Sequence, residues 1–351
     1  MLNLEIPIVQ APMAGGPSTP ALAAAVSATG ALGFVAAGYR SPDALAGDIA
    51  EVRAATGRPF GVNLFAPQAA PADPALVEAY VQRLRPEAER AGVELGAPAF
   101  HDDHYDAKLE RLAADPVAVV SFTFGCPTAE VVDRLHAAGS EVWVTITEPG
   151  EARQAADAGA DTLVVQGAEA GGHRGSFADG ADRVDYGLIA LLQLVAARVD
   201  LPLVASGGIA TGAAVAAVLA AGAAAAQVGS AFMLCPEAGT SAPHRALLAT
   251  DRPTGLTRAF SGRTARGIVN RLQAEHSAHA PAAYPEIHYV TAPLRAHARK
   301  AGDAGGFNLW AGEAHALARA EPAAAVVERL HEEARTAIAR AAARLGPAAG
   351  R

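Results

Sequence analysis

The feature that constrains this chain most is a unit that recurs through its first two thirds. In each unit a short apolar run ends in a polar or glycine-rich corner, and an alanine-rich amphipathic stretch follows. Continuous apolar runs are typical of parallel strands covered on both faces, and the amphipathic stretches are typical of helices. The runs that we assign to strands are 6–13, 31–37, 60–65, 117–125, 141–147, 162–167, 202–209 and 225–233.

Eight such strands alternating with helices predict a (β/α)8 barrel, the TIM-barrel fold. An open doubly wound parallel sheet is the alternative, but the glycine-rich corners after the last two strands favour the barrel. Helices are expected to begin where Ser, Thr or an acidic residue can cap them. The residues that should precede them are Thr19, Ser41, Thr128, Glu148, Asp185 and Thr211.

Three segments lie outside this repeat. Residues 66–116 are too long for a single crossover and should hold an extra helix. Residues 236–320 are rich in Pro, His, Gly and Arg, which predicts a helical insertion after the eighth strand. Residues 322–345 form an alanine-rich amphipathic pattern that could close the barrel as a last helix. We therefore expect residues 1–235 and 321–351 to build the barrel, and the insertion to cover its mouth.

Composition excludes several classes of function. The chain has 351 residues, is 51% hydrophobic and carries a formal net charge of −8, without a basic block that would suggest nucleic-acid binding. The stretch from Ile209 to Pro236 has no charge, but it is mainly Ala and Gly, so we predict a buried helix and strand, not a membrane span. The first residues lack the features of a signal peptide. We expect a cytoplasmic monomer or homodimer that acts on small molecules.

Two glycine-rich corners suggest a phosphate site. "ASGGI" at 205–209 and "QVGS" at 227–230 end the last two expected strands. Exposed N–H groups at such corners commonly bind a phosphate in barrels. The alternative is that the glycines serve only to reverse the chain. Asn63 and Gln166 are amides at otherwise apolar strand ends, and such groups suit the edge of a heterocyclic ring such as flavin.

The stretch "QGAEAGGHRGSF" at 166–177 supplies the strongest candidate for acid–base chemistry. His173 lies on a glycine-rich corner, and an imidazole that titrates near neutrality can take a proton from a carbon acid. A structural role is the alternative, because the chain contains eleven histidines. Cys126 is expected to pack, not to act as a nucleophile. We predict no metal site, since His276, His279 and His288 are scattered.

The motifs "APMAGG", "FGVNLF", "QGAEAGGHRG", "VASGGIATG" and "AAQVGSAFM" closely resemble nitronate monooxygenases of the bacterial class I branch, and the resemblance runs from about residue 6 to 320. It implies an FMN-dependent (β/α)8 barrel that oxidises alkyl nitronates, such as propionate 3-nitronate, with O2. The products would be a carbonyl compound and nitrite. His173 takes the place of the family's catalytic histidine, and it would first remove the α-proton if the substrate is a neutral nitroalkane.

The resemblance also implies the flavin contacts. One departure is Thr123, which takes the place where some relatives carry a second histidine. Glu169 and Arg174 are expected to brace the corner around His173. Two alternatives stay open: an FMN-dependent enoyl-acyl-carrier-protein reductase that uses NAD(P)H, and a flavin-binding protein without turnover. The implied FMN contacts are Pro12, Met13, Ala14, Asn63, Gln166 and Gly171, with Gly207, Gly208, Gln227, Val228, Gly229 and Ser230 around the phosphate.

Overall fold

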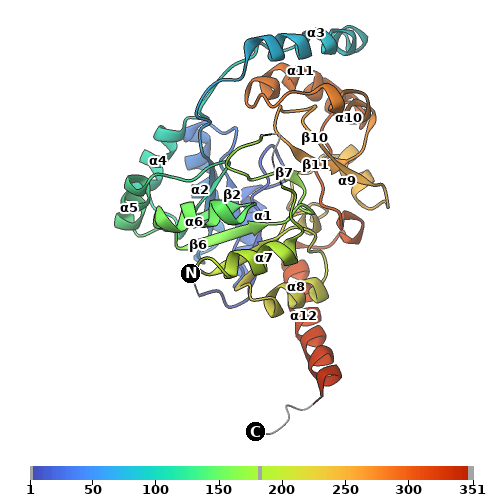
Figure 1. Ribbon diagram of the computed structural model, residues 1–351. Helices are drawn as coiled ribbons and strands as arrows, with labels where there is room; N and C mark the ends of the chain where they lie inside the picture. Colours follow the sequence, from blue (N-terminus) through green and yellow to red (C-terminus); the bar gives the residue numbers. More distant parts are fainter. Residues whose placement is uncertain (1–2, 181–183, 347–351) are drawn as a thin grey trace.

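A closed barrel of parallel strands forms the centre of the computed structural model, which describes residues 3–180 and 184–346 (Figure 1). Its strands are β1 (Ile8–Gln10), β2 (Phe34–Ala36), β3 (Gly61–Phe65), β4 (Val119–Thr123), β5 (Glu141–Ile146), β6 (Thr162–Gln166), β8 (Leu203–Ser206) and β9 (Ala225–Val228). They are hydrogen-bonded in the order β1-β9-β8-β6-β5-β4-β3-β2. A parallel bridge between Val9 and Leu32 joins the two ends of this sheet. The predicted barrel is therefore confirmed, and the open-sheet alternative is wrong.

Helices surround the barrel and begin close to the predicted caps. The side chains of Thr19, Ser41, Thr128 and Thr211 each accept an N–H of the first helical turn, and Glu148 forms a capping box with Glu151. Only the helix expected after Asp185 starts later, because Gly187 is its N-cap. The helices are α1 (Pro20–Ala28), α2 (Pro42–Ala55), α4 (Tyr105–Ala114), α5 (Ala129–Ala138), α6 (Pro149–Asp157), α7 (Leu188–Ala196), α8 (Gly212–Ala220) and α12 (Ala323–Leu345).

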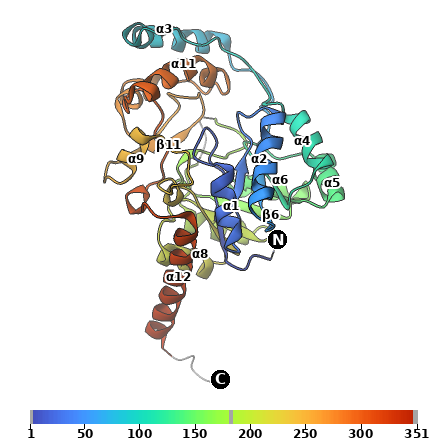
Figure 2. The same ribbon diagram turned by 180° about the vertical axis from the view of Figure 1, so that it is seen from behind.

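Two layers of apolar side chains hold the barrel together. The interior is filled by bulky residues such as Phe34, Trp143 and Val204, as expected for a barrel that is a packed core and not a pore. The outward faces of the strands pack against the helices. α12 packs on α8 and α1 and so closes the ring, as predicted, and its far end projects away from the barrel (Figure 2). The uncharged stretch 209–236 contains α8 and β9, and no helix among the described residues is long and apolar enough to cross a membrane.

The segment 66–116 contains two helices, which confirms the extra helix. α4 is the crossover helix and packs between α2 and α5. The extra helix, α3 (Pro74–Ala91), packs instead on α11 (Glu286–Ala301), on the far side of α11 from the barrel (Figures 1 and 2). Apolar residues of both helices share one cluster, among them Val77, Leu84 and Ile287. The sequence-based division groups α3 with the barrel, whereas its partner in the structure is the later segment.

The segment 236–320 is a mixed structure. It contains the expected helices, α9 (Ala242–Leu248), α10 (Arg271–His276) and α11, with two short 3-10 turns, η2 (Ser277–His279) and η3 (His315–Leu317). A third such turn, η1 (Ser230–Phe232), directly follows β9. The segment also contains two strands that the sequence does not predict, β10 (Thr254–Thr257) and β11 (Ala265–Ile268). They form an antiparallel sheet with β7 (Gly172–His173), in which Ala265 lies opposite His173. These strands are too short to be recognised from alternation alone.

Candidate active site

A cavity of about 480 Å³ lies at the carboxyl ends of the barrel strands and is lined by the strand corners and by the 236–320 segment. It brings together nearly all of the predicted site residues. Val228 is the exception, because its side chain is only 1% exposed and packs in the core between strands and helices. The predicted residues that line the cavity are Pro12, Met13, Ala14, Asn63, Gln166, Gly171, His173, Gly207, Gly208, Gln227, Gly229 and Ser230.

The two glycine-rich corners fit a phosphate group. Gly207 and Gly208 have φ of 121° and 67°, a left-handed backbone that favours glycine. The N–H groups of Gly207, Gly208 and Gly229 donate no hydrogen bond to any described residue. N–H groups left without a partner inside a protein are costly unless a ligand or water accepts from them. Together with the hydroxyl of Ser230, they form a cradle suited to a phosphate group.

Two predicted flavin contacts, Gly171 and Gln166, also have structural roles. A Cβ atom at Gly171 would overlap the backbone of Ala311 and Gly312, so the close approach of that segment requires glycine here. Gln166 Nε2 donates to the carbonyl oxygen of His173 (3.1 Å), and its Oε1 accepts from the N–H of Gly175 (2.8 Å). The Gln166 amide therefore holds the backbone of residues 173–175 in place. One of its two N–H bonds is left to donate to a ligand.

Asn63 and Thr123 belong to a hydrogen-bonded group of strand-end side chains. Asn63 Nδ2 lies 2.9 Å from Ser121 Oγ and 3.0 Å from Thr123 Oγ1, and Thr123 Oγ1 lies 3.5 Å from Thr145 Oγ1. Thr123 lines the cavity and contributes a hydroxyl group to it. A hydroxyl cannot act as a base at neutral pH.

Glu169 and Arg174 brace the corner, as predicted. The Glu169 carboxylate accepts from the N–H of Leu188 (3.0 and 3.2 Å) and so caps the start of α7. Arg174 Nη1 donates to the carbonyl oxygen of Gly167 (2.6 Å), and the guanidinium lies 3.7 Å from Asp185. Neither side chain lines the cavity.

Both the backbone and the ring of His173 are held in place by residues of the 236–320 segment. Pairing of β7 with β11 fixes the backbone, and ring Nε2 lies 2.8 Å from Ser261 Oγ. Ser261 Oγ can also donate to the carbonyl oxygen of Arg263 (3.2 Å). Both hydrogen bonds form together only when His173 carries its proton on Nε2, and this assignment leaves Nδ1 as the proton acceptor.

The surroundings of His173 keep the ring neutral. The rings of Phe124, Tyr284 and Trp310 lie 5.6, 5.9 and 5.5 Å from it between centroids. Burial, followed by the positive charges of Arg263 and Arg295, lowers the pKa of His173 to about 3. The direction of this pKa shift differs from the sequence-based expectation of an imidazole that titrates near neutrality.

Cys126 does not belong to the cavity. Its Sγ lies 3.9 Å from the carbonyl oxygen of Gln154, and the side chain packs against the main core cluster. Burial raises the pKa of the thiol to about 11, so the reactive thiolate is disfavoured. These contacts confirm the interpretation of Cys126 as a packing residue.

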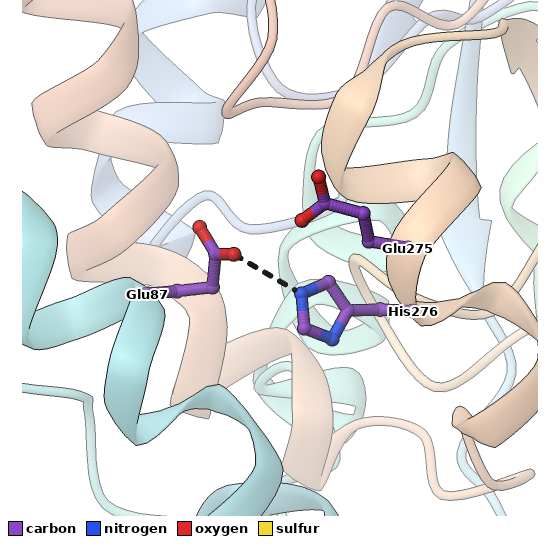
Figure 3. A group of neighbouring side chains, drawn as sticks. All are labelled: Glu87, Glu275 and His276. Atoms are coloured by element: carbon purple, nitrogen blue, oxygen red, sulfur yellow. Dashed lines mark hydrogen bonds and ion pairs between the residues drawn. The ribbon is translucent and has the colours of Figure 1, made fainter.

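One cluster outside the cavity has the composition of a metal site: Glu87 of α3 with Glu275 and His276 of α10 (Figure 3). His276 Nε2 lies 3.3 Å from Glu87. However, both terminal nitrogens of Arg271 lie 2.9 Å from the oxygens of Glu87, and one of them lies 2.9 Å from Glu275. A guanidinium thus already supplies the positive charge, and we interpret the cluster as an ionic contact that fastens α3 to α10.

Several cavity residues could not be identified from the sequence. Ser261, Arg295 and Trp310 come from the 236–320 segment, where no periodic pattern indicates which side chains turn inward. Tyr39 was also missed, although a signal exists, since it is a polar residue close after the end of the second strand. Its ring stacks on His288 with 4.1 Å between centroids.

Comparison with known proteins gives the family. Residues 2–333 match the family model described as nitronate monooxygenase. The chain belongs to the nitronate monooxygenase family. A nitronate monooxygenase of Pseudomonas aeruginosa is 42% identical over 95% of this chain and 98% of its own length. One of Paraburkholderia phytofirmans is 41% identical over 96% of this chain and 94% of its own.

Solved structures agree with membership of the nitronate monooxygenase family. A nitroalkane oxidase from Streptomyces ansochromogenes superimposes with a TM-score of 0.94 at 50% identity, covering 97% of this chain and 98% of its own. FabK from Thermotoga maritima is more distant, with a TM-score of 0.76 at 25% identity, over 96% of this chain and 95% of its own.

Proposed function

We propose that this protein is an FMN-dependent monooxygenase that oxidises alkyl nitronates, such as propionate 3-nitronate, with O2 to a carbonyl compound and nitrite. The observation that carries the proposal is one cavity lined by two different groups of residues. Unpaired N–H groups at Gly207, Gly208 and Gly229 offer a phosphate cradle, and a neutral His173 stands among aromatic rings.

FMN, when bound, supplies the redox chemistry. The chain holds the phosphate at the glycine-rich corners and presents amides of Asn63 and Gln166 toward the ring system. The aromatic side chains around His173 keep water from the reacting carbon. A nitronate arrives already deprotonated, so it needs no base, whereas a neutral nitroalkane would first lose its α-proton to Nδ1 of His173.

We also infer that residues 236–320 act as a cover over the barrel mouth. This is supported by the side chains that the segment contributes to the cavity, among them Ser261, Arg295 and Trp310. In the same way, α3 would belong to the cover in function, since it packs on α11 and not on the barrel.

Turnover assays test the proposed function. Purified protein loaded with flavin should consume O2 and release nitrite from ethyl nitronate without NAD(P)H, and heat-released cofactor should chromatograph as FMN. The result against the proposal is NADH oxidation that depends on an enoyl thioester, with no nitrite from any nitronate. That result would identify an enoyl reductase, while absence of both activities would favour a binding protein.

A further inference from the structure

The charges that line the cavity are all of one sign. The arginines Arg295 and Arg299 line it, and none of the described residues that line it is Asp or Glu. This is unexpected in a chain with a formal net charge of −8. A cationic lining without carboxylates favours a negatively charged ligand.

Arg295 is a half-buried positive charge with no carboxylate partner among the described residues. Burial lowers the pKa of its guanidinium to about 10, and no described Asp or Glu is among the charged groups that act on it. Its hydrogen bonds go to neutral acceptors: Nε to Thr291 Oγ1 (2.9 Å), Nη2 to the carbonyl oxygen of His288 (2.8 Å) and Nη1 to Asn308 Oδ1 (3.3 Å). A positive charge that is partly removed from water and has no carboxylate beside it favours an anionic ligand in the cavity.

A second arginine near His173, Arg263, has a structural role. Arg263 is buried and does not line the cavity. Its guanidinium donates to the carbonyl oxygen of Arg174 and to Gln68 Oε1, and it stacks over the ring of Phe124 at 4.2 Å. The negative charge of Asp179 also acts on it. Arg263 is thus satisfied by the protein, whereas Arg295 faces the cavity without a carboxylate.

The flavin phosphate is not the expected partner of Arg295. The hydrogen bonds of Arg295 go to His288, Thr291 and Asn308, none of which belongs to the glycine-rich corners. Its charge acts instead on His173. Asn308 also lines the cavity, and its amide nitrogen donates to no described residue.

We propose that Arg295 and Asn308 form an oxyanion-binding site that holds a negatively charged group of the substrate in the cavity. Arg295 Nη1 keeps one N–H beyond its hydrogen bond to Asn308. This N–H and the neighbouring amide N–H groups of Asn308 can donate to two oxygens on one atom. Such a pair occurs in the nitronate itself and in a carboxylate further along the substrate. This inference rests on the proposed function for the identity of the substrate, but not for the presence of an anion site.

The test compares Arg295→Met with Arg295→Lys and with Lys300→Met, which removes one positive charge from the exposed face of the same helix. Each flavin-loaded protein is assayed with ethyl nitronate and with propionate 3-nitronate. Arg295→Met should raise KM about 10- to 100-fold with a much smaller change in kcat, since hydrogen bonds to charged groups have this value. The KM of Arg295→Lys should lie between those of the wild type and Arg295→Met. The KM of Lys300→Met should match that of the wild type.

The two substrates separate the two sources of the anion. An equal rise in KM for both substrates shows that Arg295 holds the nitronate oxygens, and a rise only for propionate 3-nitronate shows that it holds the carboxylate. The proposal is overturned if neither KM rises more than about twofold above that of Lys300→Met. It is also overturned if Arg295→Met loses flavin, because the arginine would then belong to the cofactor site.

Binding of nitrate, a planar oxyanion, gives a readout that needs no turnover. Nitrate titrated into the flavin-loaded protein should change the tryptophan fluorescence, to which Trp310 in the cavity contributes. Its affinity should fall at least about tenfold in Arg295→Met. If that variant does not fold, Arg295→Lys and Asn308→Leu decide by the same titration. Nitrate binding without nitronate oxidation in the wild type would refute the proposed function and leave the anion site standing.

Discussion

At the scale of single residues, the low pKa of His173 limits the chemistry of the site. A base works best when its pKa lies near the operating pH, and the pKa of this imidazole is lowered to about 3. Proton removal from a nitroalkane should therefore be slow compared with direct use of a nitronate. His173→Asn should lower nitroalkane turnover about 10²- to 10⁴-fold and nitronate turnover much less. Nitrite release from both forms of nitroethane measures the difference.

Two other outcomes with His173→Asn would contradict the role of His173 as a base. An equal loss with both substrates would mean that His173 positions the anion or tunes the flavin. Unchanged activity with both would show that the imidazole is structural. In the wild type, nitronate turnover should show no ionisation of His173 between pH 5 and 8, because the ring is already neutral throughout that range.

A second residue-scale prediction concerns the phosphate cradle. Gly208 is a poor place to test it, since its φ is 67° and an added Cβ would lie 3.1 Å from that of Glu169. Gly229 is better, because an added Cβ there meets only ordinary contacts at 3.5 and 3.7 Å. Gly229→Val should keep the thermal midpoint of the apoprotein and lose more than about half of the bound flavin. Gly57→Val, at an exposed glycine with open space, should retain the flavin.

At the scale of elements, one ionic contact joins α3 to α10. Burial alone would raise the pKa of Glu87, but hydrogen bonds from Arg271 and His276 lower it to about 2. Glu87→Gln leaves Arg271 without its buried partner and should cost about 1–3 kcal/mol of unfolding free energy. Glu275→Gln, at an exposed position, should cost less than about 0.5 kcal/mol. Thermal or denaturant unfolding measures both.

The same cluster separates an ionic contact from a metal site. Because Arg271 already neutralises the carboxylates, EDTA should not change the thermal midpoint of the wild type. A midpoint that falls with EDTA and recovers with zinc would show instead that Glu87, Glu275 and His276 bind a metal.

At the scale of the whole molecule, the cavity should make the protein sensitive to acid. Burial, as the first cause, lowers the pKa of His173, His244 and His288 to about 3, 4 and 2. In the unfolded chain each would titrate near 6.5, so between pH 6.5 and 4 the unfolded state binds more protons and stability falls as the pH falls. At pH 5, each of these three rings should lower the free energy of unfolding by about 2 kcal/mol.

Calorimetric unfolding of the flavin-loaded protein at pH 7, 6 and 5 measures this loss, and His244→Gln should make the decline shallower. The lowered carboxyl pKa values of Glu87 and Asp179, both about 2, add losses mainly below pH 4.5. A stability that stays constant from pH 7 to 5 would show that these rings become charged in the folded protein.

The sequence by itself determined the barrel and the part of the cavity lining that comes from the strand ends. Each strand–helix unit carries its own apolar run and, in most units, its own cap, such as Thr19 or Thr211, so its structure is encoded locally. Parallel strands bring their carboxyl ends to one rim, and residues there, such as Asn63 and Gly208, necessarily meet.

Only the tertiary structure decided how His173 behaves. β11 pairs with the two residues of β7, and Ser261 approaches the imidazole, although these partners lie far apart in the chain. Burial among these segments then lowers the pKa of His173, and the charges of Arg263 and Arg295 lower it further. Such contacts leave no periodic signal in the sequence, because desolvation and charge act through space and depend on which segments finally surround the ring.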